Sequence, residues 1–167
     1  SSGLTPAHGK KLAITPQTAA QVEKLGELPV HKAGFKIPYF NIAGKPTKFW
    51  RFRFLESVHS GMMAQTDAKE LRYMQPKDTV NELYIPPLLN WQEIADDNEA
   101  PLVITEGELK AGAACALGIA TLGLGGVWMF RAKKKDVALL PGFKDFKWKG
   151  RPVYICYDSD AASNADV

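Results

Sequence analysis

The sequence predicts an α/β fold in two lobes, and three features support this prediction. In the first half of the chain, apolar and polar residues alternate, which is typical of strands with one buried face. In the second half, short apolar runs flank an alanine-rich helical segment, which indicates a parallel sheet covered by helices. A polar stretch at 96–99 separates the two patterns. We therefore predict a smaller mixed α/β lobe over residues 1–98 and a second α/β lobe over residues 99–167.

The first lobe is expected to contain a helix, a β-hairpin and three short elements. Thr15-Pro16 predicts a helix start and Gly26 its end, because threonine caps helices, proline suits their first position and glycine ends them. Alternation predicts a hairpin from strands at 34–41 and 48–55, with one hydrophobic and one partly basic face. The short elements are strands at 71–74 and 82–85 and a helix at 91–95.

The second lobe shows strand–helix–strand order. Apolar strands are predicted at 102–105, 119–124 and 152–157, and a helix at 107–117 that ends at Gly118. Buried strands connected in this order form a parallel sheet, and ligands of such sheets bind at the carboxyl ends of the strands.

Composition and local patterns exclude several classes of function. The net charge is +3, which permits a polyanionic partner without requiring one. The two cysteines are far apart and form no CxxC pair, which favours a reduced, cytoplasmic protein and excludes a zinc finger in this stretch. Gly44-Lys45-Pro46 lacks the earlier glycine of an ATP-binding P-loop. No apolar run is long enough to span a membrane, so no membrane partner is expected.

Three acidic residues follow two of the predicted parallel strands. Glu106 follows the first strand, and Asp158 and Asp160 follow the third. If these strands are neighbours, three carboxylates converge, and like charges at one place need a proton or a cation. Carboxylate oxygens suit Mg²⁺, with Mn²⁺ as a substitute, so these residues are the predicted catalytic and metal-binding set. The alternative is that each acid is structural: Thr105 and Glu108, for example, have the spacing of a capping box.

Basic and glycine residues elsewhere are candidates for binding nucleic acid or nucleotides. Arg51 and Arg53 on the hairpin, with Arg72 and Tyr73, fit a single-strand track of charge and stacking, or equally a solvated basic face. Glycines after the second strand allow close approach to phosphate. The further candidates are Gly125, Gly126, Lys110, Arg131 and Lys133. The alternative for Lys110 is an ion pair with Glu106 or a solvent position, and the alternative for Arg131 and Lys133 is a solvated segment.

The acidic motifs resemble those of the TOPRIM fold. Residues 102–111 (LVITEGELKA) are similar to its first motif, an apolar strand followed by Glu-Gly and a helix. Residues 154–160 (YICYDSD) are similar to its second motif, an apolar strand ending in Asp-x-Asp. The resemblance implies that Glu106 is the acid–base or metal-linked glutamate and that Asp158 and Asp160 hold Mg²⁺. It also implies a partial TOPRIM lobe, truncated at its carboxyl end, because that fold has a further helix and strand.

The upstream lobe resembles the one that precedes TOPRIM in bacterial-type and phage primases, through a hairpin with a glycine turn and arginines, then Arg72-Tyr73 and Leu83-Tyr84. The resemblance implies a primase-like nucleotidyltransferase in a phage or plasmid replication protein, which works in the cytoplasm of a bacterial host cell. Such a protein synthesises primers from nucleoside triphosphates on single-stranded DNA. A helicase or another replication domain is the expected partner. A TOPRIM nuclease and a non-catalytic nucleic-acid-binding module of a helicase–primase remain the alternatives, and a shortened fragment can bind without catalysing.

Overall fold

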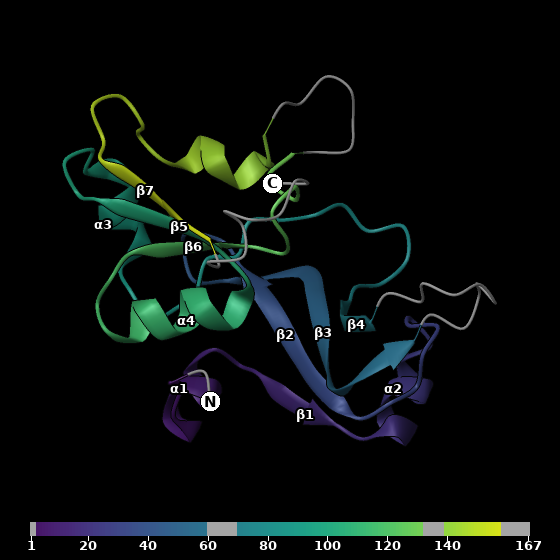
Figure 1. The fold of residues 1–167 in the computed structure, drawn as a ribbon. Coiled ribbons are helices and arrows are strands. Elements are labelled where there is room, and N and C mark those ends of the chain that lie inside the picture. The colour runs from purple at the N-terminus through teal and green to yellow at the C-terminus, as the bar shows by residue number, and fades with distance from the viewer. Residues whose placement is uncertain (1–2, 60–69, 132–138, 158–167) are drawn as a thin grey trace.

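The computed structural model describes residues 3–59, 70–131 and 139–157 of the 167-residue chain. They form a mixed α/β structure with two sheets (Figure 1). The antiparallel sheet has the strand order β1-β2-β3-β4, and the parallel sheet has the order β6-β5-β7. The elements are α1 (Pro6–Lys11), β1 (Thr15–Gln17), α2 (Ala19–Leu25), β2 (Gly34–Phe40), β3 (Pro46–His59), β4 (Glu70–Met74), α3 (Trp91–Asp96), β5 (Leu102–Glu106), α4 (Glu108–Ala116), β6 (Thr121–Leu124), η1 (Pro141–Asp145) and β7 (Val153–Cys156).

The dipeptide Thr-Pro occurs twice near the amino terminus, and it starts a helix only once. Thr5-Pro6 begins α1, with Thr5 as the N-cap. Thr15-Pro16 lies instead in β1, at the edge of the sheet, where the missing N–H of proline is tolerated. The predicted helix start at Thr15 is therefore wrong: α2 begins after Thr18, whose hydroxyl accepts a hydrogen bond from the Gln21 amide. The predicted end at Gly26 is confirmed, with φ +64°.

Both faces of the predicted hairpin are covered where β2 and β3 pair. On one face, aromatic residues of β3 pack against α2 in a core of Val22, Leu28, Trp50, Phe52, Phe54 and Val58. The other face carries Phe49 and Arg51, which are buried where this sheet meets α4 and the segment around Tyr84. The hairpin is confirmed, but the expectation of a partly basic outer face is wrong at Arg51, because the second lobe packs on that face.

The parallel sheet has β5 at its centre, with β6 and β7 as its neighbours. In Figure 1, α4 lies on one side of this sheet and the yellow-green η1 turn on the other. The predicted strand at 82–85 is replaced by a single bridge, in which the backbone of Tyr84 exchanges hydrogen bonds of 3.0 and 2.9 Å with Gly123. This bridge attaches the connecting segment to the edge of β6.

The core of the parallel lobe contains residues from both sides of the predicted lobe boundary at residues 98–99. Leu83, Ile85, Trp91 and Ala95 precede residue 98, yet they pack in this core with residues of β5, α4, β6 and the region of η1. The later members are Leu102, Cys115, Leu122, Leu124, Leu140, Phe143 and Phe146.

Within the described ranges, no helix has the length and apolar character needed to cross a membrane.

Candidate functional site

The carboxyl ends of the parallel strands meet at one edge of the sheet. Thr105 of β5 pairs with Cys156 of β7, and Glu106 pairs with Leu124 of β6. The Thr105 hydroxyl also donates a 2.8 Å hydrogen bond to the Cys156 carbonyl, which fastens the ends of β5 and β7 together. The first and third predicted strands are therefore neighbours, which is the condition for the acids that follow them to converge. This edge is where an open parallel sheet binds its ligands.

Glu106 lies half-buried at this edge, at the end of the central strand. Burial first, and then the charge of Glu106, raise the pKa of Tyr157, so the carboxylate acts on the residue just after β7. The next residue, Gly107, has φ +92°, a conformation that favours glycine, and its amide donates a 2.7 Å hydrogen bond to the Leu124 carbonyl. This turn directs the chain from β5 straight into α4.

The proposed metal ligands are only partly within the described residues. Asp158 and Asp160 lie outside them, because the described residues end at Tyr157, one residue after β7. Within residues 3–59, 70–131 and 139–157, no three His, Cys, Asp or Glu side chains come together as a metal site. Glu106 offers the hard oxygen ligand that Mg²⁺ prefers, whereas Glu108 is already paired with an arginine. The described part therefore fits a Mg²⁺ site through one ligand, Glu106.

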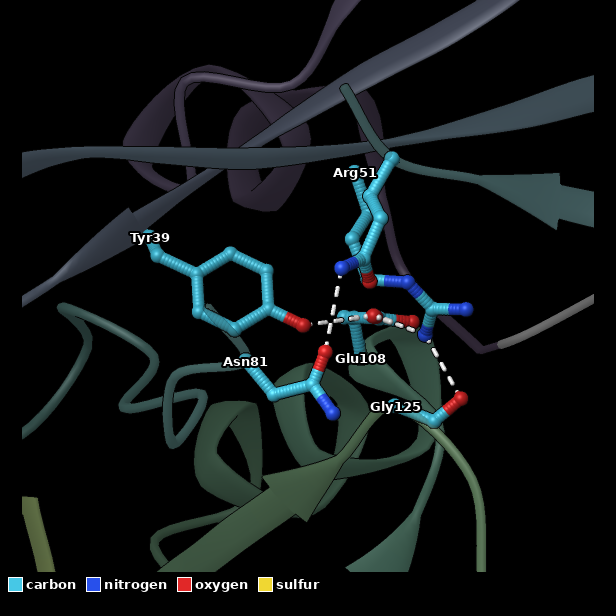
Figure 2. A network of polar contacts seen from close by, with 6 residues as sticks. Tyr39, Arg51, Asn81, Glu108 and Gly125 are labelled. Carbon is cyan, nitrogen blue, oxygen red and sulfur yellow. Dashed lines mark hydrogen bonds and ion pairs between the residues drawn. The ribbon is translucent and has the colours of Figure 1, made fainter. Parts of the chain in front are cut away.

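A buried polar cluster lies next to this edge, where the two sheets meet (Figure 2). We call Tyr39, Arg51, Glu108 and the carbonyl of Gly125 the Arg51 cluster. Arg51 Nη1 donates to Glu108 Oε1 and to the Gly125 carbonyl, each at 2.7 Å. The Tyr39 hydroxyl donates to the same Glu108 oxygen at 2.7 Å. Glu108 is 0% exposed, so its charge is balanced inside the protein by Arg51.

The electrostatics of the Arg51 cluster keep its groups in fixed protonation states. Burial by itself lowers the pKa of Arg51, but the Glu108 carboxylate and then Tyr39 raise it, and the net direction is upward. Burial, followed by the charge of Glu108, raises the pKa of Tyr39 well above its usual range. Arg51 therefore stays charged and the Tyr39 hydroxyl keeps its proton, and both groups remain donors to Glu108.

The capping-box interpretation of Thr105 and Glu108 is wrong. The N-cap of α4 is Gly107, and the Thr105 hydroxyl donates to the Cys156 carbonyl on the neighbouring strand. The Glu108 carboxylate accepts from Tyr39 and Arg51 of the other sheet. Both side chains thus connect elements that are distant in the sequence.

The arginines expected to form a nucleic-acid track are not equivalent. Arg51 is 7% exposed and its guanidinium is bound within the Arg51 cluster, so it lies away from the surface. Arg53 is half-buried and pairs across the sheet with Tyr73, whose ring centre lies 5.9 Å from the guanidinium. Arg72 is exposed, and alternation along β4 places it on the opposite face from Tyr73. Arg53 and Tyr73 therefore lie on one face of this sheet and Arg72 on the other.

Four of the remaining predicted residues are within the described part of the chain, and one is outside it. Gly125 and Gly126 follow β6, as expected, and Gly125 touches Arg51. Arg131 is exposed and stacks near Phe130, with 5.1 Å from the guanidinium carbon to the ring centre. Lys110 is exposed in the first turn of α4. Lys133 lies outside the described residues.

Sequence reasoning missed Tyr39 and Glu108 as parts of the site. A signal for them was present in β3, where Arg51 alternates with the aromatic residue Phe49 on one strand face. An arginine that shares a strand face with an aromatic residue needs a buried carboxylate where another element covers that face, because an unpaired buried charge is costly. Periodicity alone does not say which of the acids in the chain supplies that carboxylate.

Comparison with known proteins gives one match. Residues 90–167 match the family model described as a domain of unknown function, DUF3854. The match covers just under half of the 167 residues and includes β5, α4, β6 and β7, the elements that form the site. No curated protein and no solved structure matches the chain.

Proposed function

We propose that this protein is the core of a TOPRIM-type, Mg²⁺-dependent nucleotidyltransferase that joins nucleoside triphosphates on single-stranded DNA, as a primase does. The observation that carries the proposal is the parallel pairing of β5 with β7, in which Thr105 lies beside Cys156. This pairing brings the chain that leads into Asp158 and Asp160 next to Glu106. The raised pKa of Tyr157, caused by burial and then by Glu106, supports the same proximity.

In the proposed site, Glu106, Asp158 and Asp160 hold the metal and the protein positions the two substrates. A bound Mg²⁺ supplies positive charge to the phosphates and leaves coordination positions for them. Glu106 takes the proton of the attacking hydroxyl or completes the ligand set. The backbone at Gly125 and Gly126, at the end of the adjacent strand β6, approaches the triphosphate. Template DNA lies along Arg53 and Tyr73, with charge and stacking as the binding forces.

The metal site is tested by calorimetry of Mn²⁺ titrated into the protein in the presence of ATP. We expect binding in the wild type, and loss of binding in Glu106→Ala, Asp158→Ala and Asp160→Ala. Glu23→Ala, which removes an exposed acid on α2, is the matched control and should bind as the wild type does. Equal binding by the wild type and the Asp158→Ala/Asp160→Ala double variant would refute the site.

The reaction type is tested by giving the same protein two assays with Mg²⁺. Primer synthesis on single-stranded DNA is the expected result. Strand cleavage without synthesis would assign the nuclease alternative, since the same acids then activate water. DNA binding that survives loss of all three acids, with neither activity, would assign the binding module.

The DNA track is tested by the salt dependence of oligo-dT binding. In single-stranded DNA, each phosphate contact contributes about 0.7 to the slope of log affinity against log salt. Arg53→Ala should lower this slope by about 0.7, whereas Arg72→Ala, on the opposite face of the sheet, should leave it unchanged if the template lies along Arg53 and Tyr73. Lys24→Ala, on exposed α2, serves as the charge-matched control with an unchanged slope. An unchanged slope in Arg53→Ala would remove this face from the DNA path, and a lower slope in Arg72→Ala would move the path to the opposite face.

A further inference from the structure

The Arg51 cluster connects four segments of the chain at the carboxyl-terminal edge of the parallel sheet, with Tyr39 contributed by β2 (Figure 2). Arg51 comes from β3 of the antiparallel sheet, and Glu108 is the first residue of α4, two positions after Glu106. The Gly125 carbonyl belongs to the loop after β6. A single nitrogen, Arg51 Nη1, therefore links the turn that carries Glu106 to the glycine loop.

The hydrogen bonding of this cluster is incomplete. Among the residues that the structure describes, Arg51 Nε and Glu108 Oε2 are buried atoms without a hydrogen-bond partner. A buried ion pair whose other polar atoms are unsatisfied contributes little to stability, because desolvation of the two charges offsets their attraction. Apolar residues of similar size would fill the same space at no greater cost. Stability alone therefore does not account for this pair.

The glycine loop is shaped to receive Arg51. A Cβ atom added to Gly125 would lie 2.5 Å from Arg51 Nη1 and 3.0 Å from Arg51 Cζ. At Gly126, the nearest atom to an added Cβ is Met129 Sδ, at 3.4 Å. The close approach of the guanidinium thus depends on glycine at position 125, and it fixes the position of that peptide relative to Glu108.

We propose that Arg51 and Glu108 are positioning residues, which hold the Glu106 turn and the Gly125–Gly126 loop together in the geometry that binds a metal–triphosphate. This inference rests on the proposed function and assigns to the antiparallel sheet a second task in it. The sheet that carries the DNA track also sets, through Arg51, the shape of the site on the neighbouring sheet. Arg51 and Glu108 act through Glu106 and the glycine loop, and neither touches the substrate.

The test uses the single variants Arg51→Met and Glu108→Gln and the double variant that combines them. Each single variant leaves one buried charge without its partner and should be less stable than the wild type. The double variant removes both charges and should recover most of the stability, as measured by urea unfolding. Its affinity for Mn²⁺ with ATP should nevertheless remain weaker by about tenfold or more, because the link to Gly125 is absent. Recovery of affinity together with stability would show that the pair is only structural and would overturn the inference.

A second measurement follows the loop without any ligand. Amide hydrogen exchange at Gly107 and over residues 125–129 should be faster in the double variant than in the wild type. Tyr84→Phe is the matched control: it removes a buried hydroxyl from the same core, beside Tyr39, and should leave both exchange and affinity unchanged. Unchanged exchange in the double variant would overturn the inference.

The affinities of the wild type and of the double variant for Mn²⁺ with ATP distinguish failure of the positioning inference from failure of the proposed function. A wild type that binds no Mn²⁺ with ATP would refute the proposed site, and with it the ligand part of the inference. A wild type that binds, accompanied by a double variant that binds equally well, would refute the positioning role and leave the proposed function standing.

Discussion

Two arginines are buried to the same extent in this protein, but they are held in different ways. Arg51 and Arg151 are each 7% exposed. Arg51 contacts the carboxyl-terminal edge of the parallel sheet through Glu108 and the loop after β6. Arg151 lies at the opposite, amino-terminal edge, two residues before β7.

Arg151 is bound by backbone carbonyls from three segments. Its Nε donates to Lys147 at 2.7 Å, and its Nη1 donates to Ala100 at 2.9 Å. Its Nη2 donates to Ile94 and Ala95, at 2.8 and 3.1 Å, near the carboxyl end of α3. A positive charge is favoured there, because the last carbonyls of a helix lack helical partners. All three guanidinium nitrogens are thus satisfied, and the residue joins α3, the start of β5 and the approach to β7.

The contrast indicates different roles for the two edges. At the amino-terminal edge, satisfied hydrogen bonds connect backbone segments, which is what stability requires. At the carboxyl-terminal edge, Arg51 Nε and Glu108 Oε2 lack partners within the described part of the chain. Buried groups that are poorly satisfied tend to occur where a protein gives up stability for function. The difference therefore supports placing the functional site at the Arg51 edge.

The largest expected effect is loss of stability when Arg151 is replaced. Arg151→Met keeps the aliphatic part of the side chain but leaves several carbonyls without their donor, and each such loss costs about 1–3 kcal/mol. We expect the free energy of unfolding, measured in urea, to fall by about 4 kcal/mol.

The neighbouring Lys147→Met variant controls for loss of charge. Its ammonium forms a 3.0 Å ion pair with Asp96, but the two side chains are 63% and 78% exposed. Exposed pairs contribute little, so this variant should lie close to the wild type. Equal effects of Arg151→Met and Lys147→Met would contradict the proposed structural role of Arg151.

Replacing Tyr39 should have a smaller effect on the free energy of unfolding than replacing Arg151, and only the effect of Tyr39 should depend on pH. Tyr39→Phe removes a hydrogen bond to the charged Glu108 and should cost about 2 kcal/mol at neutral pH. The pKa of Tyr39 in the folded protein is raised, by burial and then by Glu108. Its contribution to stability is therefore complete below the usual tyrosine pKa of about 10 and decreases by up to about 1.4 kcal/mol for each pH unit above it.

The measurement is the difference in unfolding free energy between wild type and Tyr39→Phe over pH about 8 to 11, which brackets the tyrosine pKa. This difference should decrease as the pH rises. The corresponding difference for Arg151→Met should stay constant, because arginine keeps its charge throughout the range. A Tyr39 difference that is flat over this range would show that its hydroxyl is not the group that titrates.

The smallest change in stability is expected for substitutions in the glycine loop after β6. Gly125→Ala places a Cβ atom 2.5 Å from Arg51 Nη1 and should lower the free energy of unfolding by about 1 kcal/mol, since the arginine must shift. Gly126→Ala meets only Met129, at 3.4 Å or more, and should change stability by less. Thermal unfolding of both variants tests the comparison. Equal melting temperatures would mean that Arg51 does not need the space at Gly125.

Local patterns predicted most of the elements that form the site. The strands β5, β6 and β7 and the helix α4 lie within the predicted ranges, extended by one residue at Glu106. Their sequence signals are apolar runs and glycine punctuation, which depend on neighbours along the chain. The helix start at Thr15 and the strand at 82–85 failed for a different reason. There, pairing with β2 and with Gly123 decided the structure, and such pairing overrides local propensity.

Local sequence patterns are sufficient to predict the hairpin, the strand–helix–strand order of the second lobe and the position of Glu106 at the end of a strand. These follow from periodicity and from the rule that parallel strands present their carboxyl ends together. The burial of Arg51, its pairing with Glu108 and its contact with Gly125 depend instead on tertiary packing. Those contacts join residues 57 and 74 positions apart. Which of several acids meets a buried arginine depends on how the two sheets pack, and no local pattern encodes that packing.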